Sequence, residues 1–412
     1  MFKYCIQFLI ILLLWQNNNK AKKSRLTSSS VLIGIYVVCS FMGVVELHLG
    51  DYTQPYNSNY WLPMLGFDLF ILVYLLPFRQ FDETQIKCLV LPNRKLLNVF
   101  SNIVILFSLF SIIYYAGAVR NIFSMGNLKD LRDAHEVYFE VGILSTIGSV
   151  SAANYVFAIV LYFIYSIIGD SEKRCKLLLL SSISEPIHVL SFVGRDGIVF
   201  WLFTFIFCYA FFRPYMDYDS NRKALKPIII LGSVILFPFI IISISRFGEN
   251  SGTGASIISY MGHAFLQGPL FFGIENKPLN IGASFPLFYE LTGVSRNSYN
   301  EGYTIIGDWV SWKFSTFIIS LYVSLSLSGL IIVTILMYFF FYKIFLQKRK
   351  KAINLGYFTI YLLYFQLISQ GVFYFKQYTR GGNLFIITTL VIALFLNSIS
   401  KKNHNKIILY KK

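Results

Sequence analysis

Apolar runs recur from one end of this 412-residue chain to the other, and they limit what it can fold into. A helix needs about 20 apolar residues to cross the ~30 Å hydrocarbon core of a bilayer. Only 14% of the residues are charged, whereas soluble domains carry about 25%. The sequence therefore predicts an all-α, polytopic membrane protein in which residues 1–412 form a single bundle of about 11 (10–12) transmembrane helices. The predicted spans are 2–15, 31–49, 60–77, 96–119, 141–168, 177–193, 197–212, 225–243, 314–345, 356–375 and 384–399.

Two of these spans are unusual in length. The first, 2–15, resembles a signal peptide but lacks a small-residue cleavage site, so it is predicted to be a retained helix. The segment 314–345 is too long for one straight crossing. Its first half is therefore predicted to be re-entrant or to lie at the membrane interface.

The basic residues indicate the topology. The formal net charge is +16, and 25 of the 36 Lys and Arg residues fall in six short segments. Such clustering is typical of cytoplasmic loops, and anionic membrane lipid is their expected partner rather than nucleic acid. The N-terminus is then periplasmic and the C-terminus cytoplasmic. The six segments are 16–30, 78–95, 169–176, 213–226, 343–355 and 400–412.

Two substantial loops are predicted on the outer, periplasmic side, at 120–140 and 244–313. The larger one holds 10 of the 27 glycines and 12 aromatic residues. Its segment Ser256–Leu270 is predicted to form an interfacial helix that Gly262 interrupts. Gly268-Pro269 is expected to end this helix, because proline cannot continue the hydrogen-bond ladder. A second short interfacial helix is expected in 120–140.

Arg195 and Asp196 lie between two predicted spans, flanked by glycines. A guanidinium at a short hairpin tip suits a phosphate, because its planar fork binds two oxygens at once. The alternative is a tip that sits among the lipid headgroups. Glu185 and His188 are three residues apart in the preceding span and share a helix face. They are either a proton-transfer pair or a buried polar pair that fixes packing.

Other candidates lie in or near the outer loops. Arg246 opens the larger loop and is either a second phosphate ligand or an interfacial arginine. His263 is either a general base or surface decoration on its helix. Arg132 and His135, one turn apart in the first loop, could reach the same cavity. Glu46 and Asp68, within the predicted spans, are weaker candidates.

Aromatic residues beside polar ones close the larger loop. Tyr299 and Tyr303 stand beside asparagine, glutamate and threonine, and Asp308 precedes a tryptophan. Such a set suits a carbohydrate, which needs ring stacking and hydroxyl contacts. A membrane-interface belt explains the aromatics equally well.

Several kinds of site have no pattern in the sequence. There is no phosphate-binding glycine loop, no dinucleotide fingerprint and no nucleophile elbow. The five cysteines show neither metal-ligand spacing nor a disulfide framework. No metal and no cofactor is therefore expected.

Several short features together resemble one family. They are the Leu128–Arg132 loop, the Gly194–Gly197 turn before an aromatic span, Arg246 after a span, and the Gly302–Asp308 segment with its Tyr-Thr pair. In number of spans and placement of loops, the chain is similar to the O-antigen polymerases (Wzy-type) of bacterial surface-polysaccharide assembly.

The resemblance implies a membrane glycosyltransferase of the bacterial inner membrane. It would join undecaprenyl-pyrophosphate-linked oligosaccharide units at the periplasmic face, alongside a chain-length regulator and a flippase. Arginines would neutralise the departing pyrophosphate and a base would deprotonate the acceptor hydroxyl. The implied pyrophosphate ligands are Arg195, Arg246 and Arg132; the base is His263 or, second, Asp308; and the sugar-binding or supporting residues are Asp196, His135, Glu185, His188, Tyr299 and Tyr303.

Other classes remain open at this stage. A flippase or other transporter of lipid-linked oligosaccharide should have short outer loops and polar residues spread through a central cavity. The 70-residue loop 244–313 argues against it. An O-antigen ligase shares the polymerase plan, and the sequence separates the two poorly. An acyltransferase needs a membrane-embedded histidine, which only His188 could supply.

Overall fold

The computed structural model describes residues 1–23, 26–49, 61–124, 142–169, 171–247, 253–273, 281–292, 316–346, 351–402 and 406–411. The chain forms two compact units. Unit 1 comprises Met1–Gln85, Gly252–Lys351 and Ile360–Thr389, and unit 2 comprises Ile86–Ser251, Ala352–Thr359 and Leu390–Lys412. Two helices, α17 (Leu355–Gln370) and α18 (Arg380–Lys402), begin in one unit and end in the other.

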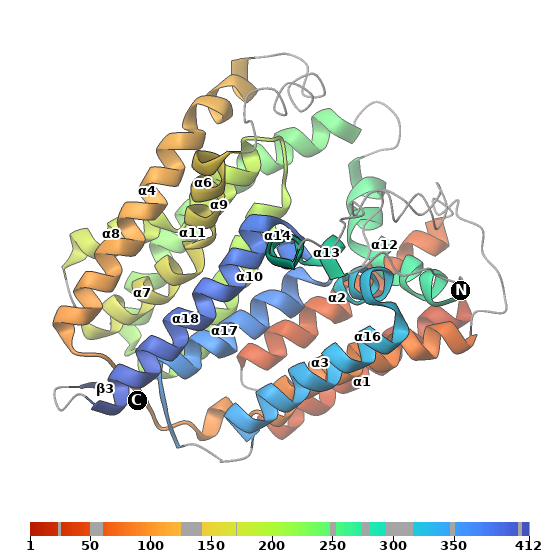
Figure 1. Cartoon of the computed structure of the whole chain (residues 1–412), viewed down its shortest axis with the longest axis horizontal. Coiled ribbons are helices and arrows are strands. Elements are labelled where there is room, and N and C mark those ends of the chain that lie inside the picture. Colours follow the sequence, from red (N-terminus) through yellow and green to blue (C-terminus); the bar gives the residue numbers. More distant parts are fainter. Residues whose placement is uncertain are drawn as a thin grey trace. The chain divides into compact units, whose positions relative to one another are not determined.

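Unit 1 is built around four helices that contact one another (Figure 1). They are α1 (Phe2–Ala21), α2 (Ser28–Leu49), α3 (Trp61–Gln80) and α12 (Thr253–Gly273). Its other elements are η1 (Glu83–Gln85), α13 (Ile281–Ser284), α14 (Pro286–Thr292), α16 (Phe317–Phe341), η3 (Tyr342–Leu346) and η4 (Lys376–Tyr378).

Glycines allow these helices to approach closely. A Cβ atom on Gly262 of α12 would lie 2.4 Å from the backbone nitrogen of Gly43 on α2. One on Gly268 would lie 2.4 Å from the ring of Phe67 on α3. Small residues at such crossings are typical of membrane helix packing, where close van der Waals contact drives association. The α2–α12 crossing is therefore fixed by a pair of glycines.

Lys22 closes one end of unit 1. Its Nζ donates to the carbonyl oxygens of Phe78 at 3.2 Å and Phe81 at 2.9 Å, and to the hydroxyl of Ser29 at 2.6 Å. These carbonyls end helix α3, so the lysine acts as a C-terminal cap. Burial lowers the pKa of Lys22, and the nearby carboxylate of Glu83 opposes that shift.

Unit 2 contains most of the middle of the chain. Its elements are β1 (Cys88–Leu91), α4 (Arg94–Ser124), α6 (Ile143–Ala153), α7 (Tyr155–Ile168), α8 (Glu172–Ser181), α9 (Ser184–Leu190), α10 (Asp196–Phe212), η2 (Arg213–Tyr215), α11 (Tyr218–Phe247), β2 (Ala352–Asn354) and β3 (Ile407–Tyr410). Aromatic rings fill its core: Trp201 meets Phe205 edge-on at 4.5 Å between centroids, and Phe163 stacks on Phe212 at 5.7 Å. Such pairs add to the hydrophobic contribution of burial.

A small three-stranded sheet, which the sequence did not lead us to expect, joins three distant segments of unit 2. The strand order is β2-β1-β3, with β2 parallel and β3 antiparallel to β1. All three strands belong to the segments that were predicted as basic cytoplasmic loops. The sheet therefore holds these loops together by backbone hydrogen bonds.

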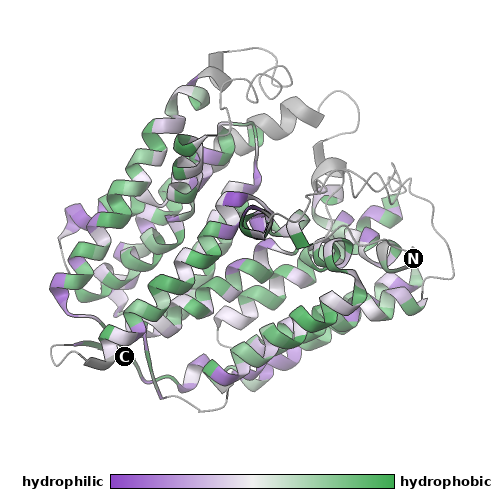
Figure 2. Cartoon of the chain, viewed as in Figure 1, coloured by the Kyte–Doolittle hydropathy of each residue, from purple (hydrophilic) through white to green (hydrophobic). Residues whose placement is uncertain are grey.

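The described residues contain seven helices that are long and apolar enough to cross a membrane, which fits the predicted multi-pass, all-α fold. Most of the residues in these helices are hydrophobic (Figure 2). The total of 11 spans stays a prediction. The segment 177–193 is not one helix but two, α8 and α9. Helix α16 is broken at Ser326, which has a left-handed φ of 65°, so the long segment 314–345 is kinked.

The segment that was predicted as the larger outer loop, 244–313, also differs from its prediction. Helix α12 runs through both Gly262 and Pro269 to Gly273, so the expected interruption and the expected end are wrong. The residues from Gly262 to Leu270 are buried, and the helix packs against α2 and α3 inside unit 1. Helix α11 extends to Phe247, so Arg246 lies within its last turn instead of opening a loop.

Candidate functional site

The α9–α10 hairpin of unit 2 brings three of the predicted site residues into one short stretch of chain. Glu185 and His188 lie on α9, and Arg195 caps the N-terminus of α10. We call Glu185, His188, Arg195 and the neighbouring Tyr115 of α4 the hairpin site. All four residues belong to the part of unit 2 that the structure describes.

A tight turn joins the two helices. Val193 has a positive φ of 59°, which is rare for a β-branched residue and indicates strain that the surroundings hold in place. The nitrogen of Gly194 donates to the carbonyl of Val189 at 2.9 Å. A Cβ atom on Gly194 would lie 2.6 Å from the Val189 side chain, and one on Gly197 would lie 2.7 Å from it. Only glycine fits at these two positions, which explains why glycines flank Arg195 and Asp196.

This turn presses the start of α10 onto the part of α9 that carries Glu185. A Cβ atom on Gly197 would lie 3.0 Å from the Glu185 carbonyl oxygen. Arg195 is 5% exposed and sits at the positive end of the α10 dipole. A buried guanidinium at a helix N-terminus is a favourable environment for an anion such as a phosphate.

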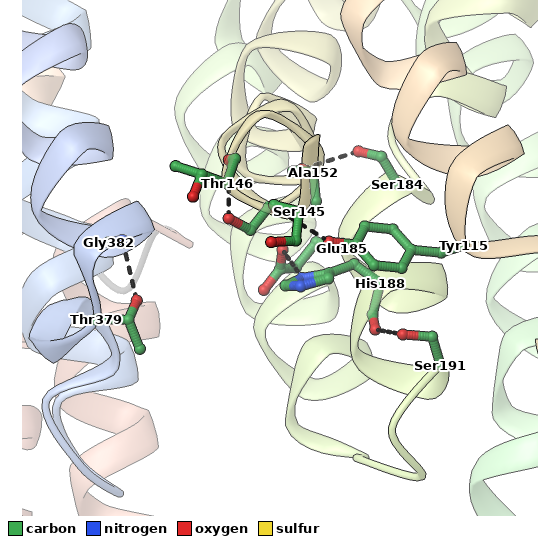
Figure 3. Close-up of polar contacts among 11 residues, drawn as sticks. Tyr115, Ser145, Thr146, Ala152, Ser184, Glu185, His188, Ser191, Thr379 and Gly382 are labelled. Atoms are coloured by element: carbon green, nitrogen blue, oxygen red, sulfur yellow. Dashed lines mark hydrogen bonds and ion pairs between the residues drawn. The ribbon is translucent and has the colours of Figure 1, made fainter. Parts of the chain in front are cut away.

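The carboxylate and the imidazole of α9 face each other. His188 Nδ1 lies 3.3 Å from Glu185 Oε2, and the side chains are 17% and 7% exposed (Figure 3). The ring of Tyr115 packs on His188 with 4.7 Å between centroids, and its hydroxyl donates to the Ser145 carbonyl at 3.4 Å. A histidine that is oriented by a carboxylate and is not fully buried can accept and return a proton.

A second carboxylate–histidine pair lies in unit 1. His263 Nδ1 of α12 is 3.2 Å from Glu46 Oε1 of α2, and Ser259 Oγ donates to the same oxygen at 2.8 Å. The two side chains are only 5% and 2% exposed. We call Glu46 and His263 the crossing pair, because they sit at the glycine-lined α2–α12 crossing. This histidine is therefore buried rather than displayed on a surface helix.

Two of the other predicted site residues, Asp196 and Arg246, lie in described helices. Asp196 begins α10 beside Arg195. Arg246 lies in the last turn of α11, but the position of its side chain is not described. The predictions that fall outside the described residues are those for Arg132, His135, Tyr299, Tyr303 and Asp308.

Sequence reasoning missed Tyr115, and it named Glu46 as a weaker candidate without pairing it with His263. Nothing local indicates that Tyr115, 73 positions before His188 in the numbering, covers the imidazole. A signal did exist in α12: Ser259, His263 and Gln267 recur every four residues in an apolar helix, which places them on one face.

Comparisons with models of protein families, with curated proteins and with solved structures found no match. Within the described residues, no group of three or more histidine, cysteine, aspartate or glutamate side chains could hold a metal ion. The hairpin site is therefore the feature of the described residues that points most directly to a function.

Proposed function

We propose that this chain is a membrane glycosyltransferase that polymerises undecaprenyl-pyrophosphate-linked oligosaccharide repeat units into surface polysaccharide, like the O-antigen polymerases that it resembles. The observation that supports this most is the hairpin site. It places a buried guanidinium at a helix N-terminus in the same hairpin as an oriented carboxylate–imidazole pair. The reaction would take place at the periplasmic face of a bacterial inner membrane.

The reaction needs both groups. The acceptor hydroxyl attacks the anomeric carbon of the donor glycan, and the bond from that carbon to the pyrophosphate oxygen breaks. Arg195 stabilises the negative charge that develops on the departing undecaprenyl pyrophosphate. His188 takes the proton of the acceptor hydroxyl, while Glu185 holds its ring and stabilises the imidazolium that forms.

This proposal gives the base role to His188 in place of His263, the first candidate from the sequence. His263 lies in unit 1, whereas Arg195, the proposed pyrophosphate ligand, lies in unit 2. His188 is three times as exposed as His263 and belongs to the same hairpin as Arg195. Asp308, Arg132 and the sugar-contacting tyrosines stay proposals that concern residues outside the described part of the chain.

A second candidate function is transport of a lipid-linked oligosaccharide. One observation favours it: α16 is a broken helix, with non-helical geometry at Ser326. Discontinuous membrane helices often form the substrate sites of transporters. The hairpin site favours the polymerase, because glycosyl transfer from a pyrophosphate needs a proton acceptor and an anion ligand in the same step.

Deleting the gene and separating the surface polysaccharide on a gel tests the proposal. A polymerase mutant should leave core lipid that carries a single repeat unit. Complete loss of attached glycan would instead indicate a flippase or a ligase, and the polymerase proposal would then be rejected. Complementation with Arg213→Ala, an exposed arginine at the far end of α10, is the matched positive control and should restore long chains.

A further inference from the structure

The β1–β3 pair of the small sheet in unit 2 is apolar on both faces. One face is buried, and its residues are at most 8% exposed: Leu89, Leu91 and Leu409. On the opposite face, Ile408 and Tyr410 of β3 are 43% and 64% exposed. Their cross-strand partners on β1, Val90 and Cys88, are half-buried. We call these four residues the outer face. A sheet face in water is normally polar, so an apolar outer face indicates contact with something other than water.

The chain connections place this sheet at the ends of long apolar helices. Strand β1 ends at Leu91 and α4 begins at Arg94, so the two Cα atoms are at most about 11 Å apart. Helix α18 ends at Lys402, and β3 begins at Ile407 (Figure 1). Helices α4 and α18 contain the two least buried of the seven candidate membrane spans, as expected for helices that face lipid. The sheet is therefore within reach of the lipid headgroups.

The segments that carry the sheet are strongly basic. They contain eight Lys or Arg residues and no Asp or Glu, and they are residues 86–100, 352–359 and 390–412 of unit 2. Lys87 is exposed, and the backbone nitrogen of Lys411 donates to its carbonyl oxygen at 3.0 Å. Lys406 is half-buried and precedes the other end of β3. Lysines thus flank the outer face at both ends, and such clusters beside a membrane helix are typical of anionic lipid binding.

Charge and composition favour one occupant of the outer face. A second copy of this chain would bring its own basic segments against the same basic segments, and like charges at an interface repel. Tyrosine is enriched at the headgroup level of bilayers, because its ring is apolar and its hydroxyl is polar. Lysine stems cover apolar surface while the ammonium group reaches a phosphate. An anionic bilayer surface therefore complements both the lysines and the apolar side chains.

We propose that the outer face is a lipid-binding surface that lies in the headgroup layer of anionic phospholipids. Ile408 and Tyr410 contact the apolar boundary of that layer, and Lys87 and Lys406 pair with the lipid phosphates. The surface anchors the adjoining ends of α4 and α18 to the membrane. This inference assigns lipid binding to a folded surface in place of the basic segments in general, and it does not depend on the proposed glycosyl transfer.

Photo-crosslinking of the full chain tests the proposal, in nanodiscs that contain equal parts of phosphatidylcholine and phosphatidylglycerol. The photo-reactive residue p-benzoylphenylalanine replaces Tyr410, and mass spectrometry identifies the crosslinked lipid. Position 410 should crosslink to lipid, with phosphatidylglycerol in excess. Lys87→Gln combined with Lys406→Gln should lower that excess by about fivefold for each lysine removed. The matched control is Lys173→Gln combined with Lys223→Gln, two exposed lysines elsewhere in unit 2, and it should keep the excess.

Three results would overturn the proposal. A lack of lipid crosslinks from position 410 in the otherwise unchanged chain would show that the outer face does not meet the bilayer. Crosslinks to a second copy of the chain or to another protein would show that a protein covers this face instead. An equal fall in the phosphatidylglycerol excess in both lysine pairs would assign the lipid preference to overall charge. The unfolding midpoint of each variant shows whether its fold is retained.

Discussion

The hairpin site and the crossing pair contain the same two side chains at almost the same distance, 3.3 Å in one and 3.2 Å in the other. They differ in surroundings. His188 is 17% exposed and shares a hairpin with a buried arginine, whereas His263 is 5% exposed at a crossing of two glycines. A carboxylate–histidine pair therefore does not define a role by itself. Its greater exposure and the neighbouring arginine suit His188 for a reaction, whereas His263 is packed inside unit 1.

Arg195→Ala should have the largest effect on activity. Loss of the guanidinium removes the charge that stabilises the leaving pyrophosphate, and polymer formation should fall about 10²–10³-fold. Arg195→Lys should recover only part of the rate, because a lysine cannot bind two oxygens in a fixed fork. The measurement is chain length and turnover at matched protein amount. Normal chain length in both variants would remove Arg195 from the site.

Gly262→Ala should destabilise the α2–α12 crossing and leave the hairpin site unchanged. The added Cβ atom would meet the Gly43 backbone at 2.4 Å, so α2 and α12 must separate. Overpacking of this kind costs about 1–3 kcal/mol of stability. Thermal unfolding in detergent measures the loss, and Gly117→Ala is the control, since its Cβ atom would have nothing within 4 Å. Equal stability of the two variants would mean that the glycine crossing does not hold unit 1 together.

Tyr115 variants separate packing from hydrogen bonding in the hairpin site. The hydroxyl donates a long 3.4 Å bond to the Ser145 carbonyl, whereas the ring lies 4.7 Å from His188. Tyr115→Phe should therefore keep activity within about twofold, and Tyr115→Leu should lower it about tenfold by freeing the imidazole. The expected kinetic result for Tyr115→Leu is a lower kcat with an unchanged KM. A stronger effect of the phenylalanine variant would assign the role to the hydroxyl.

Removing the exposed ion pair between Glu172 and Lys176 should have the smallest effect on stability. The hydrogen bond from Lys176 lowers the pKa of Glu172, so any stability it provides is present above the ordinary glutamate range and is lost as the pH falls through the lowered pKa. Both side chains are exposed, and such pairs contribute little. Glu172→Gln should leave the unfolding midpoint unchanged at neutral and at acidic pH. A clear fall in the unfolding midpoint at neutral pH alone would show that this exposed pair does stabilise the fold.

The apolar runs predicted most of the helices, because their length alone matches a membrane crossing. The i, i+3 spacing also predicted the Glu185–His188 contact, which lies within one helix. The sequence could not predict contacts between distant segments. Glu46 and His263, for example, are separated by 217 positions. The strands β1, β2 and β3 are three or four residues long, too short for a period-two pattern to identify. For α12, periodicity indicated a helix but not which helices cover its polar face.

The most direct test compares the two histidines in one preparation. Purified His188→Gln and His263→Gln would be reconstituted with undecaprenyl-pyrophosphate-linked repeat units, and the release of undecaprenyl pyrophosphate would be measured per folded molecule. The account predicts that His188→Gln lowers the rate about 10²–10⁴-fold. It predicts that His263→Gln changes mainly the unfolding midpoint. Full activity in His188→Gln, with loss of activity in a stably folded His263→Gln, would contradict it.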